Sequence, residues 1–128
     1  MATVDLDQAG LESALNKDSS IVFVDFWAAW CGPCQQFGPI YERVSEKHPD
    51  ITFAKIDTDA NQELSAIAGI RSIPTLLAFR DGILLFNRSG ALTEPSLENV
   101  IGQVRAVDMA QVRAEIAAHA AKSEELSP

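Results

Sequence analysis

The hydrophobic positions of this 128-residue chain recur in two patterns, one with the period of a strand and one with the period of a helix. Residues 21–27 are almost all apolar and predict a buried strand, and residues 33–47 carry apolar positions at helical spacing. Pro39 falls inside that helix and predicts a kink, because proline removes one backbone donor. The other predicted elements are a helix after Asp7, a strand over 51–57, a helix over 61–68, strands over 75–79 and 83–86, and a helix from Thr93 to Arg105.

The order of these elements predicts an α/β fold built on one central mixed sheet. Strands that alternate with helices pair in parallel through right-handed crossovers. Asp81-Gly82 between two apolar runs is instead typical of a tight turn that joins antiparallel strands. Helices then flank the sheet on both faces. We expect one domain over residues 1–107, followed by a C-terminal helical extension and tail over 108–128.

The extension carries the signals of a separate helix. Asp108 and Gln111 have the spacing of a capping box, and the alanine-rich sequence that follows favours helix over 109–121. The alternative is one long helix that continues the preceding one, since nothing at the junction forbids helix. We expect the extra helix to pack on its own domain or to pair with a second copy, and residues 123–128 to be disordered.

Composition narrows the class of protein. The formal net charge is −8, and the ten Lys and Arg residues are scattered, so a nucleic-acid partner is not expected. The first 20 residues hold four acidic side chains and no apolar block, which is unlike a signal peptide. A run of about 18 apolar residues is also absent, so the sequence predicts no membrane span or membrane partner. We expect a cytoplasmic protein.

Two cysteines, the only ones in the chain, lie where the first strand meets its helix. Cys31 and Cys34 form a dithiol that can close into a small disulfide ring. A helix N-terminus lowers the pKa of a thiol, so Cys31 is expected to be exposed and to attack, whereas Cys34, one turn further in, resolves. Gly32 allows a tight turn and Pro33 restrains the ring at the helix start.

Metal binding is the competing chemistry for this cysteine pair. One Cys-x-x-Cys supplies two ligands, whereas a closed zinc site needs four. His48 and His119 lie far from the pair in sequence, and each is expected to be an ordinary surface histidine. We therefore expect no metal, and a site shared between two chains is the remaining alternative.

A carboxylate inside the first strand suggests a proton acceptor. Asp25 lies among apolar neighbours, so burial should raise its pKa and let it exchange a proton near neutrality. The alternative is that Asp25 points outward. Lys55 on the next strand is either its buried cationic partner or a solvated residue. Pro74 precedes a strand, and sequence alone does not choose between a trans bond, the statistical default, and a cis bond.

Five short stretches together carry the motifs of one known family. They are 24–34 (VDFWAAWCGPC, with Pro39 after it), 54–57 (AKID), 69–75 (GIRSIPT), 79–82 (FRDG) and 89–91 (SGA). These stretches occur in the same order as in the thioredoxin family, which the chain resembles from about residue 3 to residue 105. Residues from about 108 onward lie outside the resemblance.

The resemblance implies the fold, the activity and the partners. It implies a central sheet flanked by helices, reduction of protein disulfides, no bound cofactor, and a dithiol that an NADPH-dependent flavoprotein thioredoxin reductase recharges. Pro74 is then a cis proline facing the dithiol, and Asp25 with Lys55 accepts the proton of Cys34. An extended substrate segment would pair with the Ile73 backbone, as in strand addition. The implied substrate-binding residues are Trp30, Gly32, Pro33, Ile73, Pro74, Gly90 and Ala91.

One departure and several alternatives remain open. The family usually has Lys or Arg directly after the second cysteine, and this chain has Gln35, which leaves the thiolate pKa and the redox potential open. The alternatives to a reductase are a non-catalytic thioredoxin-fold binding module or subunit, and an oxidase or isomerase. We expect roles in electron transport and cell redox homeostasis, and a monomer, with a dimer through the C-terminal helix as the alternative.

Overall fold

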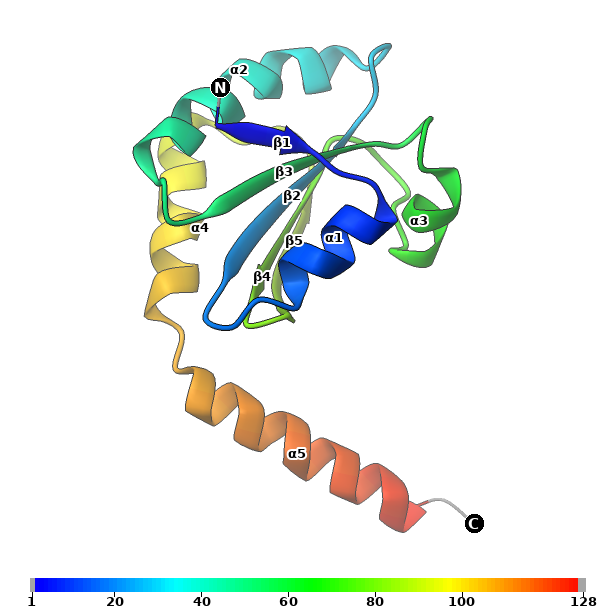
Figure 1. The fold of residues 1–128 in the computed structure, drawn as a ribbon, viewed down its shortest axis with the longest axis vertical. Coiled ribbons are helices and arrows are strands. Elements are labelled where there is room, and N and C mark those ends of the chain that lie inside the picture. The colour runs from blue at the N-terminus through cyan, green and yellow to red at the C-terminus, as the bar shows by residue number, and fades with distance from the viewer. Residues whose placement is uncertain (1, 127–128) are drawn as a thin grey trace.

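The computed structural model describes residues 2–126, and their five strands form one mixed sheet with the order β1-β3-β2-β4-β5 (Figure 1). β2 is the central strand. It pairs in parallel with β3, which pairs in parallel with β1, and it pairs antiparallel with β4. The elements are β1 Thr3–Asp5, α1 Gln8–Leu15, β2 Ile21–Trp27, α2 Gly32–Lys47, β3 Thr52–Asp57, α3 Gln62–Ile67, β4 Thr75–Arg80, β5 Ile83–Ser89, α4 Glu94–Ala106 and α5 Met109–Leu126.

The sheet separates two apolar layers, which confirms the predicted arrangement of helices on both faces. Side chains of α2 and α4 pack on one face around Phe23, Tyr41 and Leu97, and side chains of α1 and α3 pack on the other around Val24 and Leu64. Successive residues of β2 point to opposite faces. Because Asp25 has the parity of Phe23, it belongs to the face that α2 covers.

Local signals explain most of the element ends. The Asp7 carboxylate caps α1 by accepting from the Gly10 N–H at 2.9 Å, and Thr93 caps α4 in the same way through the Ser96 N–H. Asp81 and Gly82 have φ values of +55° and +76°, which suit the tight antiparallel turn between β4 and β5. These ends agree with the helices predicted after Asp7 and from Thr93 and with the turn predicted at Asp81-Gly82.

The first strand was not predicted. β1 is only three residues long, and two of them, Thr3 and Asp5, are polar, so it shows no hydrophobic run from which a strand could be predicted. It forms because it pairs with β3 and because α2 binds it from the side. The Glu42 carboxylate accepts from the Thr3 hydroxyl and, at 2.9 Å, from the Ala2 N–H. Both partners are distant in sequence, so tertiary contacts decide this strand.

The break before the last helix is confirmed. Val107 has extended backbone angles, φ −63° and ψ +134°, and it separates α4 from α5. Asp108 accepts from the Gln111 N–H at 3.2 Å, as the predicted cap requires. The second half of the capping box is wrong, because the Gln111 side chain donates to Glu115 one turn further along.

The alternative in which α5 packs on its own domain holds only for the start of the helix, up to Arg113, and pairing with a second copy stays a prediction. Figure 1 shows α5 projecting away from the sheet and its covering helices. Met109 is buried and Val112 is half-buried, but Ile116 is 50% exposed. The helix also continues to Leu126, so the predicted disorder is wrong for 123–126, and 127–128 lie outside the described residues. Alanine-rich sequence without a stop signal allows the helix to continue.

Two adjacent side chains of the β4–β5 hairpin hold this junction. The Arg80 guanidinium donates to the carbonyl oxygens of Val104, Arg105 and Val107 at 3.0 to 3.1 Å. These carbonyls lie at the C-terminal end of α4, where a helix leaves its last acceptors unpaired. Asp81 in turn pairs with Arg113 of α5 at 3.2 Å. One hairpin thus contacts both helices at the point where the chain changes direction.

Candidate active site

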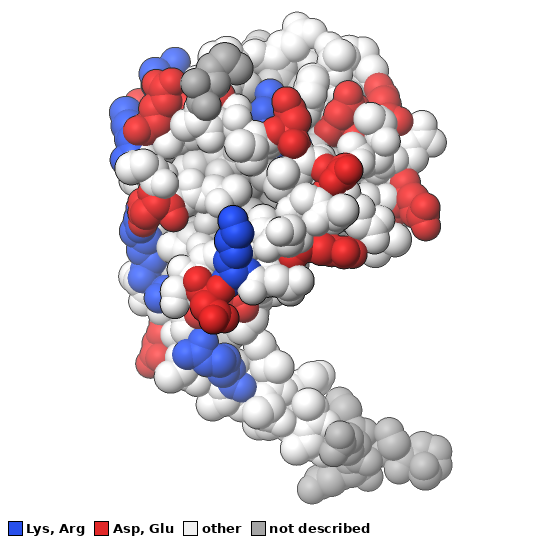
Figure 2. Space-filling view, in the orientation of Figure 1, with Lys and Arg blue, Asp and Glu red and all other residues white. Residues whose placement is uncertain are grey.

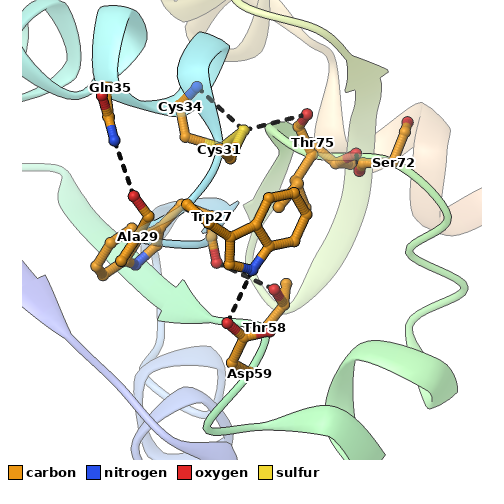
Figure 3. Close-up of a disulfide and its surroundings, with 11 residues drawn as sticks. Trp27, Ala29, Cys31, Cys34, Gln35, Thr58, Asp59, Ser72 and Thr75 are labelled. Carbon is orange, nitrogen blue, oxygen red and sulfur yellow. Dashed lines mark hydrogen bonds between the residues drawn. A yellow bond between two sulfur atoms is a disulfide. The ribbon is translucent and has the colours of Figure 1, made fainter.

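Cys31 and Cys34 form a disulfide at the N-terminus of α2, with their Cα atoms 5.2 Å apart (Figure 3). Cys31 is the N-cap residue of this helix, and its sulfur accepts the Cys34 backbone N–H at 3.2 Å. A backbone donor directed at the sulfur favours the thiolate form of Cys31 once the disulfide is reduced. Reversible oxidation of this pair is the chemistry that the site can perform.

The predicted difference in exposure between the two cysteines is wrong. Cys31 is 4% exposed and Cys34 is 5% exposed. The disulfide ring packs against Ala28, Trp27 and Ile73, and the Ile73 carbonyl oxygen lies 3.6 Å from the Cys31 sulfur. The two sulfurs therefore differ by hydrogen bonding and position on the helix, not by burial in the oxidised state.

Asp25 is buried behind this site, so the alternative in which it points outward is excluded. It is 1% exposed, and neither carboxylate oxygen has a hydrogen-bond partner among the described residues. Burial raises the pKa of Asp25 from 3.8 to about 7, against the smaller opposing effect of the Lys55 charge. A carboxyl with this pKa holds and releases a proton near neutral pH.

Lys55 fits neither predicted alternative fully, since it is neither fully buried nor fully solvated. It stands opposite Asp25 in the β2–β3 register, but it is half-buried and makes no ion pair within the described part of the chain. Its ammonium lies 4.5 Å from the centroid of the Trp27 ring, an arrangement in which an aromatic face stabilises a cation. Lys55 thus supplies positive charge near Asp25 while its ammonium remains associated with the ring.

The loop before β4 closes the other side of the dithiol. The Ile73–Pro74 peptide bond is cis, as the resemblance implies. The Pro74 carbonyl accepts from the Gly90 N–H at 2.8 Å, and the Thr75 hydroxyl donates to the Ser72 carbonyl at 2.6 Å. These contacts bring three of the predicted substrate-binding residues, Ile73, Pro74 and Gly90, to one region beside Cys31.

The exposed residues of the predicted docking surface are held by a neighbouring loop. Trp30 is 70% exposed, and its indole N–H donates to the Asp59 carboxylate at 2.9 Å. Gly32, Pro33 and Ala91 are also exposed. Sequence reasoning missed Asp59. The only feature of the sequence that marks this residue is the polar run after β3, and that run does not indicate that Asp59 binds Trp30. The Thr58 N–H and hydroxyl both donate to the Trp27 carbonyl, so this loop is anchored to the end of β2.

Comparison with known proteins identifies the family. A sequence model described as thioredoxin matches residues 2–103. The chain belongs to the thioredoxin family. It is 45% identical over 122 residues to a putative thioredoxin 2 from Streptomyces coelicolor, covering 95% of this chain and 90% of that one. It is 40% identical over 95 residues to a thioredoxin from Mycoplasmoides gallisepticum, covering 74% and 94%.

Solved thioredoxins share the fold. The Fasciola hepatica thioredoxin superposes with a TM-score of 0.73 at 34% identity, covering 79% of this chain and 97% of that one. A mutant thioredoxin from Halobacterium salinarum gives a TM-score of 0.72 at 36% identity, covering 79% and 88%. With the Cys31–Cys34 pair in place, this thioredoxin is a thiol–disulfide oxidoreductase that reduces protein disulfides by dithiol–disulfide exchange.

The C-terminal extension is shared more widely than the sequence motifs suggested. The family model ends at residue 103, in agreement with the expected limit of the resemblance. The match to the Streptomyces relative spans 122 residues, however, so it reaches beyond residue 107 into the extension. The extension is therefore not peculiar to this thioredoxin.

Residues outside the dithiol complete the description of the surface. Among the side chains that the structure describes, residues 2–122, no group of three or more His, Cys, Asp or Glu could hold a metal. His48 instead contacts Glu98 and Arg105 at the end of α2, and His119 is exposed. No helix described in this thioredoxin has the length and hydropathy of a membrane span. On the face drawn in Figure 2, basic side chains lie among acidic ones on the left, whereas only acidic side chains are seen on the right, the side of α3.

Proposed function

We propose that this chain reduces protein disulfides with Cys31 as the attacking thiolate, Cys34 as the resolving thiol and Asp25 as the proton acceptor. The observation that carries this assignment is the Cys31–Cys34 disulfide at the helix N-terminus, with the buried Asp25 on the sheet face that the same helix covers. The family relationship supports the activity itself.

The first step belongs to Cys31. Its thiolate attacks one sulfur of a substrate disulfide, so a Cys31–substrate bond forms as the substrate S–S bond breaks. The displaced substrate thiolate takes a proton. The Cys34 N–H, which contacts the Cys31 sulfur, stabilises the negative charge before attack.

The second step regenerates the disulfide. Cys34 gives its proton to Asp25, and the resulting thiolate attacks the Cys31 sulfur. The mixed disulfide breaks, the second substrate sulfur leaves as a thiolate and takes up a proton, and two electrons have passed from the dithiol to the substrate. Asp25 suits this role because its pKa of about 7 lets it accept a proton at neutral pH, and the Lys55 charge favours its ionised form.

Substrate docks on the surface formed by Trp30, Ile73, Pro74, Gly90 and Ala91, with Gly32 and Pro33 beside it. Its support is the exposed Trp30 ring and the contacts that place Ile73 and Gly90 around Pro74. The Ile73 carbonyl beside the Cys31 sulfur offers a backbone acceptor to an extended substrate segment.

The dithiol is recharged by an NADPH-dependent flavoprotein thioredoxin reductase, and the protein holds no cofactor of its own. This places it in electron transport and cell redox homeostasis in the cytoplasm, as a monomer. The support is the membership of the thioredoxin family over residues 2–103 and the single redox pair among the described residues.

NADPH oxidation in the presence of a thioredoxin reductase and insulin tests this function. We expect oxidation to require both cysteines, and the redox equilibrium with glutathione to report the potential of the pair. The matched control is Cys31→Ser, which should abolish turnover while the fold persists. If this variant retained full biological activity in cells, the protein would act as a binding module instead.

A further inference from the structure

Gln35, the first residue after the dithiol, makes a contact that the mechanism above does not use. Its side-chain amide donates to the Ala29 carbonyl at 2.8 Å, as Figure 3 shows. Its backbone N–H donates to the Cys31 carbonyl at 3.1 Å. One residue of α2 therefore binds the chain segment that enters the dithiol at two points, one through the backbone and one through the side chain.

The carbonyl that Gln35 holds belongs to the turn that presents Trp30. The Cys31 N–H donates to the Ala28 carbonyl at 3.2 Å, which leaves Ala29 and Trp30 at the corner of this turn. The Ala29 carbonyl and the Trp30 N–H share one planar peptide group, so fixing the first also fixes the orientation of the second. The Asp59 carboxylate then restrains the indole from the other end.

We propose that Gln35 is a positioning residue for substrate docking. Its amide holds the Ala29–Trp30 peptide, so that Trp30 stands in place beside Cys31 before a substrate arrives, and the ordering cost of docking falls. It does this with a neutral donor, so it adds no positive charge beside the dithiol. This proposal rests on the proposed docking role of Trp30.

Two substitutions of Gln35 distinguish the effect of its hydrogen bond from the effect of a charge at this position. Methionine at residue 35 has nearly the length of glutamine but cannot donate, so it removes the hydrogen bond alone. Lysine keeps a donor and adds a charge. Gln36 supplies the matched control, since it is the next residue of the same helix, is exposed, and makes no side-chain hydrogen bond to the described residues.

Kinetics with two substrates tests the proposal. For insulin, which must dock, Gln35→Met should raise KM about two- to tenfold, the range expected for one lost hydrogen bond, with little change in kcat. For dithiobis(nitrobenzoate), a small disulfide, KM should change little. Gln35→Lys should restore the KM for insulin and move alkylation of Cys31 to lower pH, whereas Gln36→Met should match the wild type.

The results also separate this proposal from the proposed function. If Trp30→Ala raises KM for insulin but Gln35→Met does not, the role of Gln35 is wrong and the docking surface stands. If Trp30→Ala leaves KM unchanged, the docking surface fails and the role of Gln35 fails with it. An equal rise in KM for both substrates in Gln35→Met would also overturn the proposal, because it would place the effect at the dithiol.

Discussion

Replacing Asp25 by asparagine should make the protein more stable at neutral and alkaline pH while it slows turnover. The carboxyl is 1% exposed and lacks a hydrogen-bond partner among the described residues, so its ionised form is poorly solvated. Asparagine has nearly the same shape and cannot ionise. The substitution therefore removes the charge and the proton acceptor together.

The size of the effect follows from the pKa of Asp25, which burial raises from 3.8 to about 7. Below pH 3.8 the carboxyl is protonated in the folded and the unfolded chain and has no pH-dependent effect. Between these two values the unfolded chain releases its proton first, so the free energy of unfolding falls by about 1.4 kcal/mol per pH unit as pH rises. Above the folded pKa the loss levels off at about 4 kcal/mol.

Urea unfolding of the oxidised wild type and of Asp25→Asn, measured from about pH 4 to pH 8, isolates the loss of stability that ionisation of Asp25 causes. All other titrating groups are common to both proteins, so they cancel in the difference between the two unfolding free energies. The cost of burying an amide, roughly 1–3 kcal/mol, is independent of pH and shifts the whole curve. We expect the advantage of the variant to grow by about 4 kcal/mol across this range.

A difference that stays constant across this range would refute the reasoning, because Asp25 would then titrate alike in both states. The kinetic half of the prediction is separate. The rise of wild-type turnover with pH near 7 should disappear in Asp25→Asn, since no carboxyl remains to take the Cys34 proton. An unchanged pH profile would remove Asp25 from the mechanism while leaving its effect on stability intact.

Three further predictions concern the dithiol and the C-terminal junction. Alkylation of the reduced protein near pH 7, followed by mass spectrometry, should label Cys31 before Cys34, and the reverse order would exchange their roles. Deletion of residues 108–128 should leave insulin reduction largely intact because the dithiol lies at the other end of β2; lost activity in a folded variant would place the extension in the site. Arg80→Met should lower the free energy of unfolding, measured in urea, by about 1–3 kcal/mol, because the carbonyl groups at the end of α4 lose the hydrogen bonds from the guanidinium. A stability equal to that of the wild type would show that these hydrogen bonds do not stabilise the fold.

Four of the five strands, β2 to β5, were predictable because they carry their own signals. The apolar run of β2 and the Asp81-Gly82 turn are local features, and the structure agrees with both. The burial of Asp25 was also predictable, since every neighbour in its strand is apolar. In each case a few consecutive residues contain the information, and the tertiary structure adds nothing that contradicts it.

The features that sequence did not predict depend on contacts between distant segments. β1 requires β3 and Glu42, and the Trp30–Asp59 contact joins residues 29 positions apart. The burial of Cys31 arises from the loop around Ile73, 42 positions along the chain. The direction of α5 depends on the β4–β5 hairpin. Periodicity and capping signals describe one segment at a time, so they carry no information on such pairs.

The position of α5 offers a practical handle on this protein. β2 begins at Ile21, which pairs with Arg80 beside the α4–α5 junction, and it ends at Trp27, four residues before Cys31. Figure 1 shows α5 extending from the end of the domain where β2 begins, whereas α2, whose N-terminus carries the dithiol, lies at the opposite end. A bead, fluorophore or electrode linked through an exposed side chain of residues 117–122 in α5 would thus leave the redox pair facing solution, on a helix whose full length is about 27 Å at 1.5 Å per residue.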